Sequence, residues 1–504
     1  MSFSSSSRLS LHHVSIAMIV MLEYLQTIMV AFASSYISGG IDAAPEEFSL
    51  AAACYAAVAV VMILSHRWLV QQFGYRTMLR LSLLSFGIGA LMCGCANNVP
   101  EFIVGRMVQA VGGAAFFTAS RVQILHYQGK ARIPAMLAMP VGIIFGSGLA
   151  PVLAAFMVEN YSWRGMFLIM VPLALLVDIV VARAVPEREP VENEQPDELH
   201  PWGVLMLAGG IFLLQFALER ARFDLFSNGL HLWALGFFAV AILLGTLWHE
   251  WRRETPLISY REFTSERYVL GLSVYCFGYL IVSACNYILP VFMVQGLGIA
   301  VQNTGLLMGL STLIGVPVAF GHLKLMMRWP YIKYYLLCGL GLLLIFGVMM
   351  ERLSEDVPLA TMVIPVMLLS GLFMPLVLGT AAAGTFRGVE EKVFTHAYQV
   401  KNAMREVANS MGLSWATIIL QMRSNLHYHR LAESTGQMSP WYGGAGVGAD
   451  PWGLLTNPSS SSLAQLGVAL TRQSTLMACQ DFFWGVGMVA LLAAVLVAWQ
   501  RRFI

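Results

Sequence analysis

The chain has 504 residues, of which 58% are hydrophobic and only 12% are charged. So few charges cannot cover the surface of a soluble protein of this size, and the composition predicts a protein whose solvent is lipid. The formal net charge of +2 is too small to indicate a nucleic-acid partner.

Apolar runs long enough to cross a bilayer recur about fourteen times along the chain. The predicted spans are 13–36, 48–66, 77–96, 102–125, 133–157, 163–184, 201–219, 230–250, 268–292, 302–322, 332–350, 357–380, 396–421 and 479–499. The fold class predicted from them is an all-α polytopic membrane protein with about fourteen transmembrane helices.

Charge in the short loops predicts the orientation of these spans. Lys and Arg gather after the second, fourth, eighth and tenth spans and at the end of the chain, whereas loop 37–47 has neither. Short loops rich in Lys and Arg stay in the cytoplasm. We therefore expect both termini to be cytoplasmic, in a multi-pass protein of the inner (cytoplasmic) membrane.

Two segments interrupt the rhythm of short loops and divide the chain. Residues 185–200 are rich in proline and acidic residues and are predicted to be a cytoplasmic linker that closes a first six-helix bundle, 1–184. Residues 201–250 then form a two-helix insert, and 251–504 a second six-helix bundle. The second bundle contains a long loop, 422–478, that the orientation places outside. Paired bundles with a site between them are a transporter architecture.

Glu23 lies near the middle of the first span and is its one charged residue between Val14 and Tyr36. It shares a helical face with Gln26 and Thr27, and such a polar stripe faces a bundle interior or a cavity instead of lipid. Desolvation favours the protonated form of a buried carboxylate, and a proton carrier must exchange between its two forms. We interpret Glu23 as the proton-coupling residue with Arg106 as its partner; a static ion pair between two helices is the alternative.

Several motifs resemble those of the major facilitator superfamily, in particular the fourteen-span drug:proton antiporters of the EmrB/QacA type. In the fourth span, VGRMVQAVGGAAF carries Arg106, Gln109 and Gly113 at the spacing of the family motif. In the thirteenth, KNAMREVANSMG keeps Asn402 and Arg405. The resemblance covers essentially the whole chain and implies a fold of two six-helix bundles plus a two-helix insert.

The chain also departs from the family pattern at motifs tied to conformational change and coupling. The turn after the second span has Arg67 in place of a glycine but keeps Gly74 and then Arg76. The fifth-span antiporter motif keeps Gly146 and Pro151 and replaces later glycines with alanine. Where the family has an aspartate in the first span, this chain has Gln26, which supports the hypothesis that Glu23 has taken over the proton.

Other polar residues within spans are candidates to line the substrate cavity, although hydrogen bonding between helices explains each about as well. They are Gln26, Thr27, Gln109, Arg121, Asn286, Asn402 and Arg405. Arg121 follows Arg106 by fifteen residues, about 22 Å along an ideal helix, so the fourth span is expected to present two cations at different depths.

These features together predict a secondary exporter that exchanges protons for a drug-like toxicant, a siderophore or another secondary metabolite. We expect a small organic compound as the substrate and the proton gradient as the energy source, in a protein embedded in the lipid bilayer. No cofactor, metal or nucleic-acid partner is expected. The chain has no P-loop for ATP. The long outer loop suggests a periplasmic adaptor protein and an outer-membrane channel as partners. A membrane-embedded enzyme or scaffold, or a channel, is the alternative.

Overall fold

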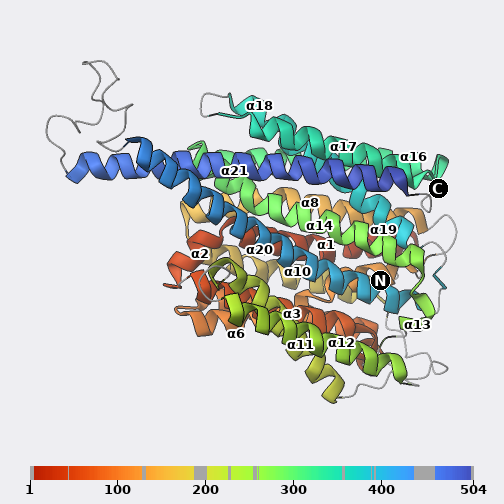
Figure 1. The fold of residues 1–504 in the computed structure, drawn as a ribbon. Coiled ribbons are helices and arrows are strands. Elements are labelled where there is room, and N and C mark those ends of the chain that lie inside the picture. The colour runs from red at the N-terminus through yellow and green to blue at the C-terminus, as the bar shows by residue number, and fades with distance from the viewer. Residues whose placement is uncertain are drawn as a thin grey trace, which may run out of the picture.

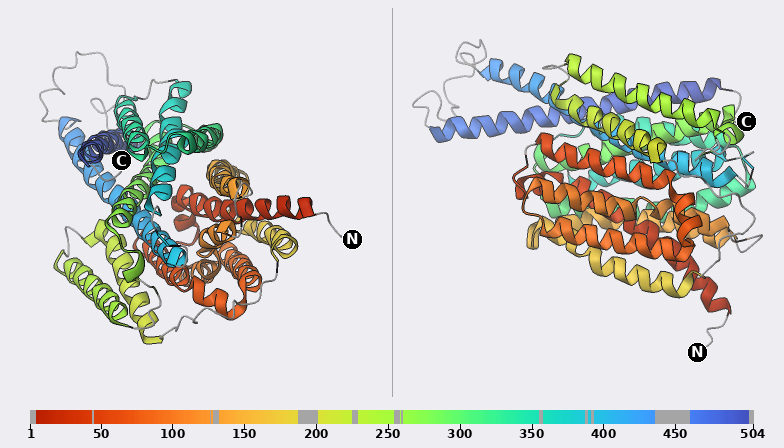
Figure 2. Two further views of the ribbon diagram at one scale, coloured as in Figure 1. Left: turned by 90° about the vertical axis from the view of Figure 1, so that its right-hand side faces the viewer. Right: turned by 90° about the horizontal axis from the view of Figure 1, so that it is seen from below.

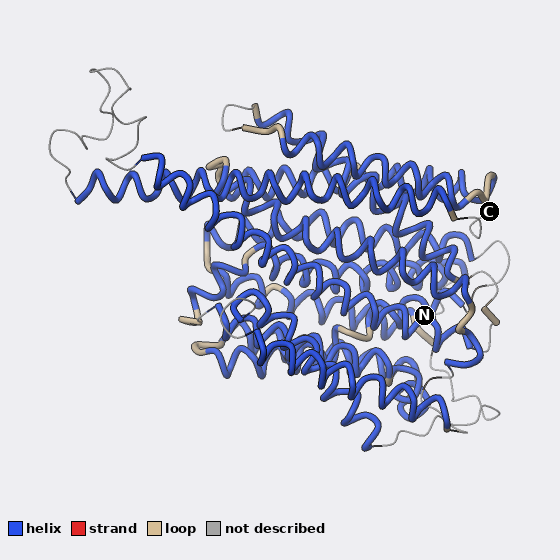
Figure 3. Tube along the Cα trace, viewed as in Figure 1, coloured by secondary structure: helices blue, strands red, loops and turns tan. Residues whose placement is uncertain are grey.

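The computed structural model describes residues 5–43, 45–125, 127, 132–186, 201–224, 229–253, 258, 260–354, 358–386, 389–390, 393–435 and 460–500. Across these residues every regular element is a helix and none is a strand (Figure 3). The start of α1 and the end of α21 lie at the same end of the bundle (Figure 1), which we call the terminal end; the opposite one is the loop end.

The described residues up to 186 form ten helices. They are α1 (Ser5–Phe32), α2 (Ser34–Gly40), α3 (Pro45–Leu64), α4 (His66–Phe73), α5 (Tyr75–Cys95), α6 (Val99–Gly113), α7 (Phe116–Leu125), α8 (Arg132–Asn160), α9 (Trp163–Leu168) and α10 (Met170–Ala184). Local sequence explains some of their starts: the Asn98 side chain accepts a hydrogen bond from the backbone N–H of Glu101 and so caps α6.

The rest of the described chain adds the remaining helices. They are α11 (Pro201–Asp224), α12 (Gly229–Arg252), α13 (Tyr260–Phe263), α14 (Glu266–Val291), α15 (Val301–Leu313), α16 (Gly315–Arg328), α17 (Ile332–Glu351), α18 (Leu359–Val366), α19 (Thr380–Thr385), α20 (Phe394–Thr435) and α21 (Ser460–Trp499), with π-helical segments η2 (Phe292–Gly296) and η3 (Met367–Gly379). Ser265 caps α14 by accepting from the N–H of Tyr268.

Eleven helices among the described residues are long and apolar enough to cross a membrane, or twelve if α3 and α4, bent by 59°, form one span. Two of the fourteen predicted spans, the seventh (201–219) and the thirteenth (396–421), do not correspond to any of these helices. In α11 the apolar stretch, Trp202–Leu218, is short. In α20 the polar residues Lys401, Asn402 and Arg405 interrupt the apolar sequence, and they are buried inside the bundle, where they do not face lipid.

Small residues let the helices approach closely. A Cβ on Gly146 of α8 would lie 2.6 Å from the carbonyl oxygen of Met21 in α1, and one on Gly305 of α15 would lie 2.6 Å from that of Pro151 in α8. Such glycines are typical of helix packing in membranes. The predicted fifth-span motif therefore lies where α8 meets both α1 and α15.

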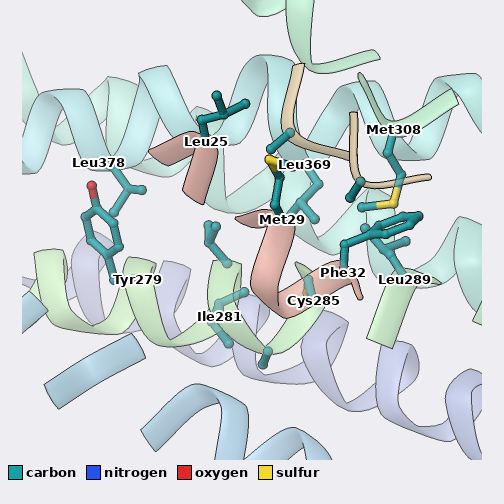
Figure 4. Close-up of a cluster of buried hydrophobic side chains, with 14 of the residues drawn as sticks. Leu25, Met29, Phe32, Tyr279, Ile281, Cys285, Leu289, Met308, Leu369 and Leu378 are labelled. Carbon is teal, nitrogen blue, oxygen red and sulfur yellow. The ribbon is translucent and has the colours of Figure 1, made fainter. Parts of the chain in front are cut away.

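A buried apolar cluster joins the early and late parts of the chain. Leu25 and Met29 of α1 pack with Tyr279 and Cys285 of α14 and with Leu369 of η3 (Figure 4). Viewed end-on (Figure 2, left), α11 and α12 lie at one edge of the bundle, with α11 against α3 and α20. On α12 large apolar side chains such as Trp233 and Phe237 are exposed, as expected of a surface that faces lipid.

Helices α20 and α21 project beyond the others at the loop end (Figure 1). Their 42 and 40 residues correspond to roughly 60 Å each, about twice a bilayer core. Residues 422–435, at the start of the predicted outer loop, are the last part of α20. Asp481 joins the two helices, at 2.7 Å from Arg423 Nε and 2.6 Å from His427 Nε2. Most of the predicted linker, 187–200, and residues 436–459 of the predicted outer loop lie outside the described residues.

Candidate functional site

A buried ion pair joins α1 to α20. Arg405 Nη2 lies 2.5 Å from Glu23 Oε1, and the two residues are 3% and 7% exposed. Glu406 Oε2 lies 3.6 Å from the same guanidinium nitrogen. Replacing one partner of such a pair leaves an uncompensated buried charge, so each partner holds the other in place.

The pairing of Glu23 with Arg106 that the sequence suggested does not form. The Arg106 guanidinium lies 3.9 Å from the ring centre of Tyr55 in α3 and donates to Gln109 Oε1 at 2.7 Å. Gln26 Nε2 donates to the same oxygen at 3.3 Å. Arg106 therefore belongs to a separate polar group with Gln26 and Gln109, because α6 directs its side chain toward α3.

Two cavities lie on the bundle interior. The first, about 410 Å³, is on the loop side, where α2 and the start of α6 lie (Figure 1). Its described wall is rich in hydroxyl and amide groups and includes the cation Arg106 and the acid Glu406. It includes Thr27 and Asn286, two of the predicted cavity residues, and Arg106, which was predicted as the partner of Glu23. Pro151 of the fifth-span motif is also in its wall.

The second cavity, about 220 Å³, lies toward the terminal end, near α16 and α19 (Figure 1). Arg121 lines it, as predicted for a second cation at another depth of the fourth span. Among the described residues of its wall, Lys401 and His322 are the other basic ones, none is Asp or Glu, and the rest are largely apolar and aromatic.

A layer of side chains separates the two cavities. Tyr24 Oη of α1 lies 2.7 Å from Tyr279 Oη of α14, and Tyr279 lines both cavities together with Ser147, Thr312 and Met374. Arg405 lies beside this layer, with its guanidinium 4.4 Å from the ring centre of Phe117, a residue in the wall of the second cavity. The ion pair is therefore next to the partition.

The remaining predicted residues lie away from the cavities. Asn402 is buried behind the wall, where its Nδ2 donates to Thr118 Oγ1 at 2.8 Å and joins α20 to α7. Arg67 Nη1 lies 2.7 Å from His396 Nε2, which links α4 to α20. Gly74 has φ +74°, a conformation that favours glycine, and begins α5. Arg76 donates to the carbonyl oxygen of Ala182 at 2.5 Å.

Sequence reasoning missed Lys401, the Tyr24–Tyr279 contact and Glu406. One signal for Lys401 was available, since Lys401 and Arg405 are four residues apart and share a helical face in an apolar span. The tyrosine contact joins residues 255 positions apart and left no local signal. Within the described ranges, no group of three or more His, Cys, Asp or Glu could hold a metal ion.

Several known proteins resemble this chain in sequence or in fold. The sequence profile of the Major Facilitator Superfamily matches residues 16–413. The chain is 21% identical to the probable multidrug resistance protein EmrY of Escherichia coli over 96% of this chain and 94% of EmrY. It is 25% identical to the putative multidrug resistance protein MdtD of Cronobacter sakazakii, over 79% and 83% of the two chains. Its fold resembles the partially occluded, inward-open xylose transporter XylE of E. coli, with TM-score 0.58 and 15% identity over 97% of each chain.

Proposed function

Because the chain belongs to the major facilitator superfamily and is a transporter, not an enzyme, we propose that it exports a small organic compound in exchange for protons. The names of EmrY and MdtD, both of which are called multidrug resistance proteins, support a drug-like toxicant as the compound. The energy source would be the proton gradient, with no cofactor.

The observation that carries this proposal is the Glu23–Arg405 pair beside the partition between the two cavities. In alternating access, a site between two bundles opens first to one side of the membrane and then to the other. A bond between α1 and α20 must yield or rearrange when the bundles rock. The bond between Glu23 and Arg405 would stabilise one of these two conformations.

Protonation of Glu23 is the proposed trigger. Burial disfavours a charged carboxylate, and the adjacent guanidinium favours it, so the balance depends on whether Arg405 stays close. If rocking separates the pair, Glu23 is left buried without its counter-charge and binds a proton. Release of that proton on the other side restores the pair. Arg405 takes the role that the sequence gave to Arg106.

We propose the following topology for the chain. It would have fourteen spans, with α11 and α20 as the seventh and thirteenth, and both termini in the cytoplasm at the inner membrane. The two bundles would be 1–184 and 251–504, with linker 185–200 and the two-helix insert 201–250 between them. The position of α11 and α12 at the edge of the bundle supports the insert.

The projecting ends of α20 and α21 support a further partner. On this orientation residues 422–435 and 460–478 would extend roughly 20 and 30 Å into the periplasm. They and the segment 436–459 between them could bind a periplasmic adaptor protein that connects the transporter to an outer-membrane channel. The proposed transport across the inner membrane does not require that partner.

Everted membrane vesicles test the core of the proposal. A pH gradient is formed and monitored with a pH-sensitive dye, and a panel of drug-like anions, cations and neutral compounds is added one at a time. A transported compound should collapse the gradient in vesicles that contain the protein and have no effect in vesicles without it. Uptake that continues unchanged after the gradient and the membrane potential are collapsed would exclude proton-driven exchange.

A further inference from the structure

Lys401 is a buried cation held among aromatic rings. Its Nζ lies 4.3 Å from the ring centre of Tyr398 and 4.4 Å from that of Tyr275, with Phe386 and Phe117 at 5.5 and 5.6 Å. Aromatic faces attract an ammonium group and help to offset its removal from water. Lys401 is 2% exposed.

The rings do not satisfy the hydrogen-bonding capacity of this ammonium group. A lysine ammonium has three N–H donors, and aromatic faces are poor acceptors. Lys401 has no hydrogen bond and no ion pair to any residue that the structure describes, yet it lines the second cavity. Burying a charged donor without an acceptor costs free energy. A ligand that supplied an acceptor would remove that cost and bind more tightly.

Arg121 brings a second positive charge to the same place. Its guanidinium lies 5.8 Å from the ring centre of Tyr398, the ring that Lys401 also faces, and 5.7 Å from that of Phe394. None of the described residues that line this cavity is a carboxylate, and the nearby Glu23 is bound to Arg405. The charge of the second cavity is therefore of one sign, in contrast with the first, where Arg106 and Glu406 are both present.

The rest of the wall suits an apolar body. Met136, Met139, Ile144, Phe320, Met326 and Leu378 are among the lining residues. Methionine side chains adapt to ligands of different shape, and apolar walls with a few placed polar groups are typical of small-molecule sites.

We propose that the second cavity binds an amphipathic organic anion, with its carboxylate, sulfonate or phosphate group at Lys401 and Arg121 and its aromatic or aliphatic body against the methionine-rich wall. This proposal rests on the proposed export function and narrows its substrate class. An anion held there lies across the Tyr24–Tyr279 partition from the first cavity.

Three probes of one shape and different charge test the charge preference: 2-naphthoate, 2-naphthamide and 2-naphthylmethylamine. Binding is measured calorimetrically on the full chain in phosphatidylcholine nanodiscs. Naphthoate is expected to bind at least about tenfold more tightly than the other two, as one charged hydrogen bond would give. Equal binding of the amide, or tighter binding of the amine, overturns the proposal, as does failure of all three to bind.

Variants locate the site. Lys401→Met should weaken naphthoate at least about tenfold and leave naphthamide unchanged, which also shows that the variant is folded, and Lys401→Arg should keep most of the affinity. Lys333→Met is the matched control, because Lys333 donates to the carbonyl oxygen of Gln500, away from the cavity. Unchanged naphthoate binding by Lys401→Met excludes Lys401 as the ligand.

Two further measurements distinguish a soluble anion from a lipid headgroup, and anion binding from proton exchange. Repeating the titration in nanodiscs that contain phosphatidylglycerol distinguishes a soluble anion, whose binding persists, from a lipid headgroup, which competes with it. Glu23→Gln should bind naphthoate normally while losing proton exchange. If the chain exchanges protons for cations or neutral compounds but binds no naphthoate, the proposed export function stands and the proposed anion site is overturned.

Discussion

Glu23 and Arg405 are 382 positions apart in the sequence, yet their side chains meet at 2.5 Å inside the bundle and join its first helix to α20. This contact connects parts of the chain that alternating access would move relative to each other. Neither residue is among the described residues that line the two cavities, but the Tyr24–Tyr279 partition lies beside both residues. The pair therefore lies next to residues that line both cavities.

Glu23→Gln should abolish proton-driven export while the protein still inserts and binds. The amide keeps the shape of the side chain but cannot carry a proton. In vesicles with an imposed pH gradient, export should fall to the level of vesicles without the protein, whereas counterflow of labelled substrate, which needs no net proton movement, should persist. Glu406→Gln is the comparison, because Glu406 also contacts Arg405. Loss of coupling in Glu406→Gln with normal coupling in Glu23→Gln would move the proton site to Glu406.

Arg405→Leu should destabilise the protein by about 3–5 kcal/mol, because it leaves Glu23 buried without its counter-charge. The double variant with Glu23→Leu should recover most of this loss. Thermal unfolding of purified protein measures both effects. Arg80→Leu provides the control, since its pair with Asp178 is largely exposed and should contribute less than about 1 kcal/mol. Equal stability of Arg405→Leu and the wild type would mean that the buried pair contributes nothing.

Gly146→Ala should impair packing, because the new methyl group would lie 2.6 Å from the carbonyl oxygen of Met21 and force α8 away from α1. Lower expression and a lower melting temperature are expected. Gly321→Ala in α16 is the matched control, since a Cβ there meets nothing within 4 Å and alanine favours a helix by roughly 0.5–1 kcal/mol. Similar behaviour of the two variants would show that the contact between α8 and α1 can relax.

Reporter fusions test the orientation. A fusion at residue 192, in the predicted linker, should give a cytoplasmic signal, and one at residue 445, in the predicted outer loop, an external signal. An odd number of crossings separates these positions in the proposed fourteen-span topology. Signals from the same side at both positions would contradict it.

Replacement of residues 436–459 by a short glycine–serine linker tests the proposed adaptor. The change leaves α20, α21 and the Asp481 contacts with Arg423 and His427 in place. Export across both membranes of a Gram-negative cell should be lost, whereas proton exchange in inner-membrane vesicles should survive. Loss of both activities would mean that the segment serves the transport cycle or folding instead of a partner.

Local patterns in the sequence were enough to establish the membrane class, most of the spans and the family. Apolar runs and loop charges are read within one helix at a time, and they do not depend on how helices pack. The same is true of Glu23, because a carboxylate in the middle of an apolar run stands out wherever the helix lies. The polar stripe with Gln26 and Thr27 also followed from helical periodicity.

The partner of Glu23 was decided by tertiary structure. Arg106 and Arg405 both lie within predicted spans, and which of them meets Glu23 depends on the packing of the helices and on the rotation of each helix about its axis. In the structure α6 turns Arg106 toward Tyr55, and α20 turns Arg405 toward Glu23. The same rotation places Lys401 and Arg121 at one ring, Tyr398, and Glu406 in the other cavity. The formal net charge of the chain, +2, does not reveal that basic groups gather at one cavity and an acidic group lies at the other. This distribution arises only when helices distant in the sequence pack side by side.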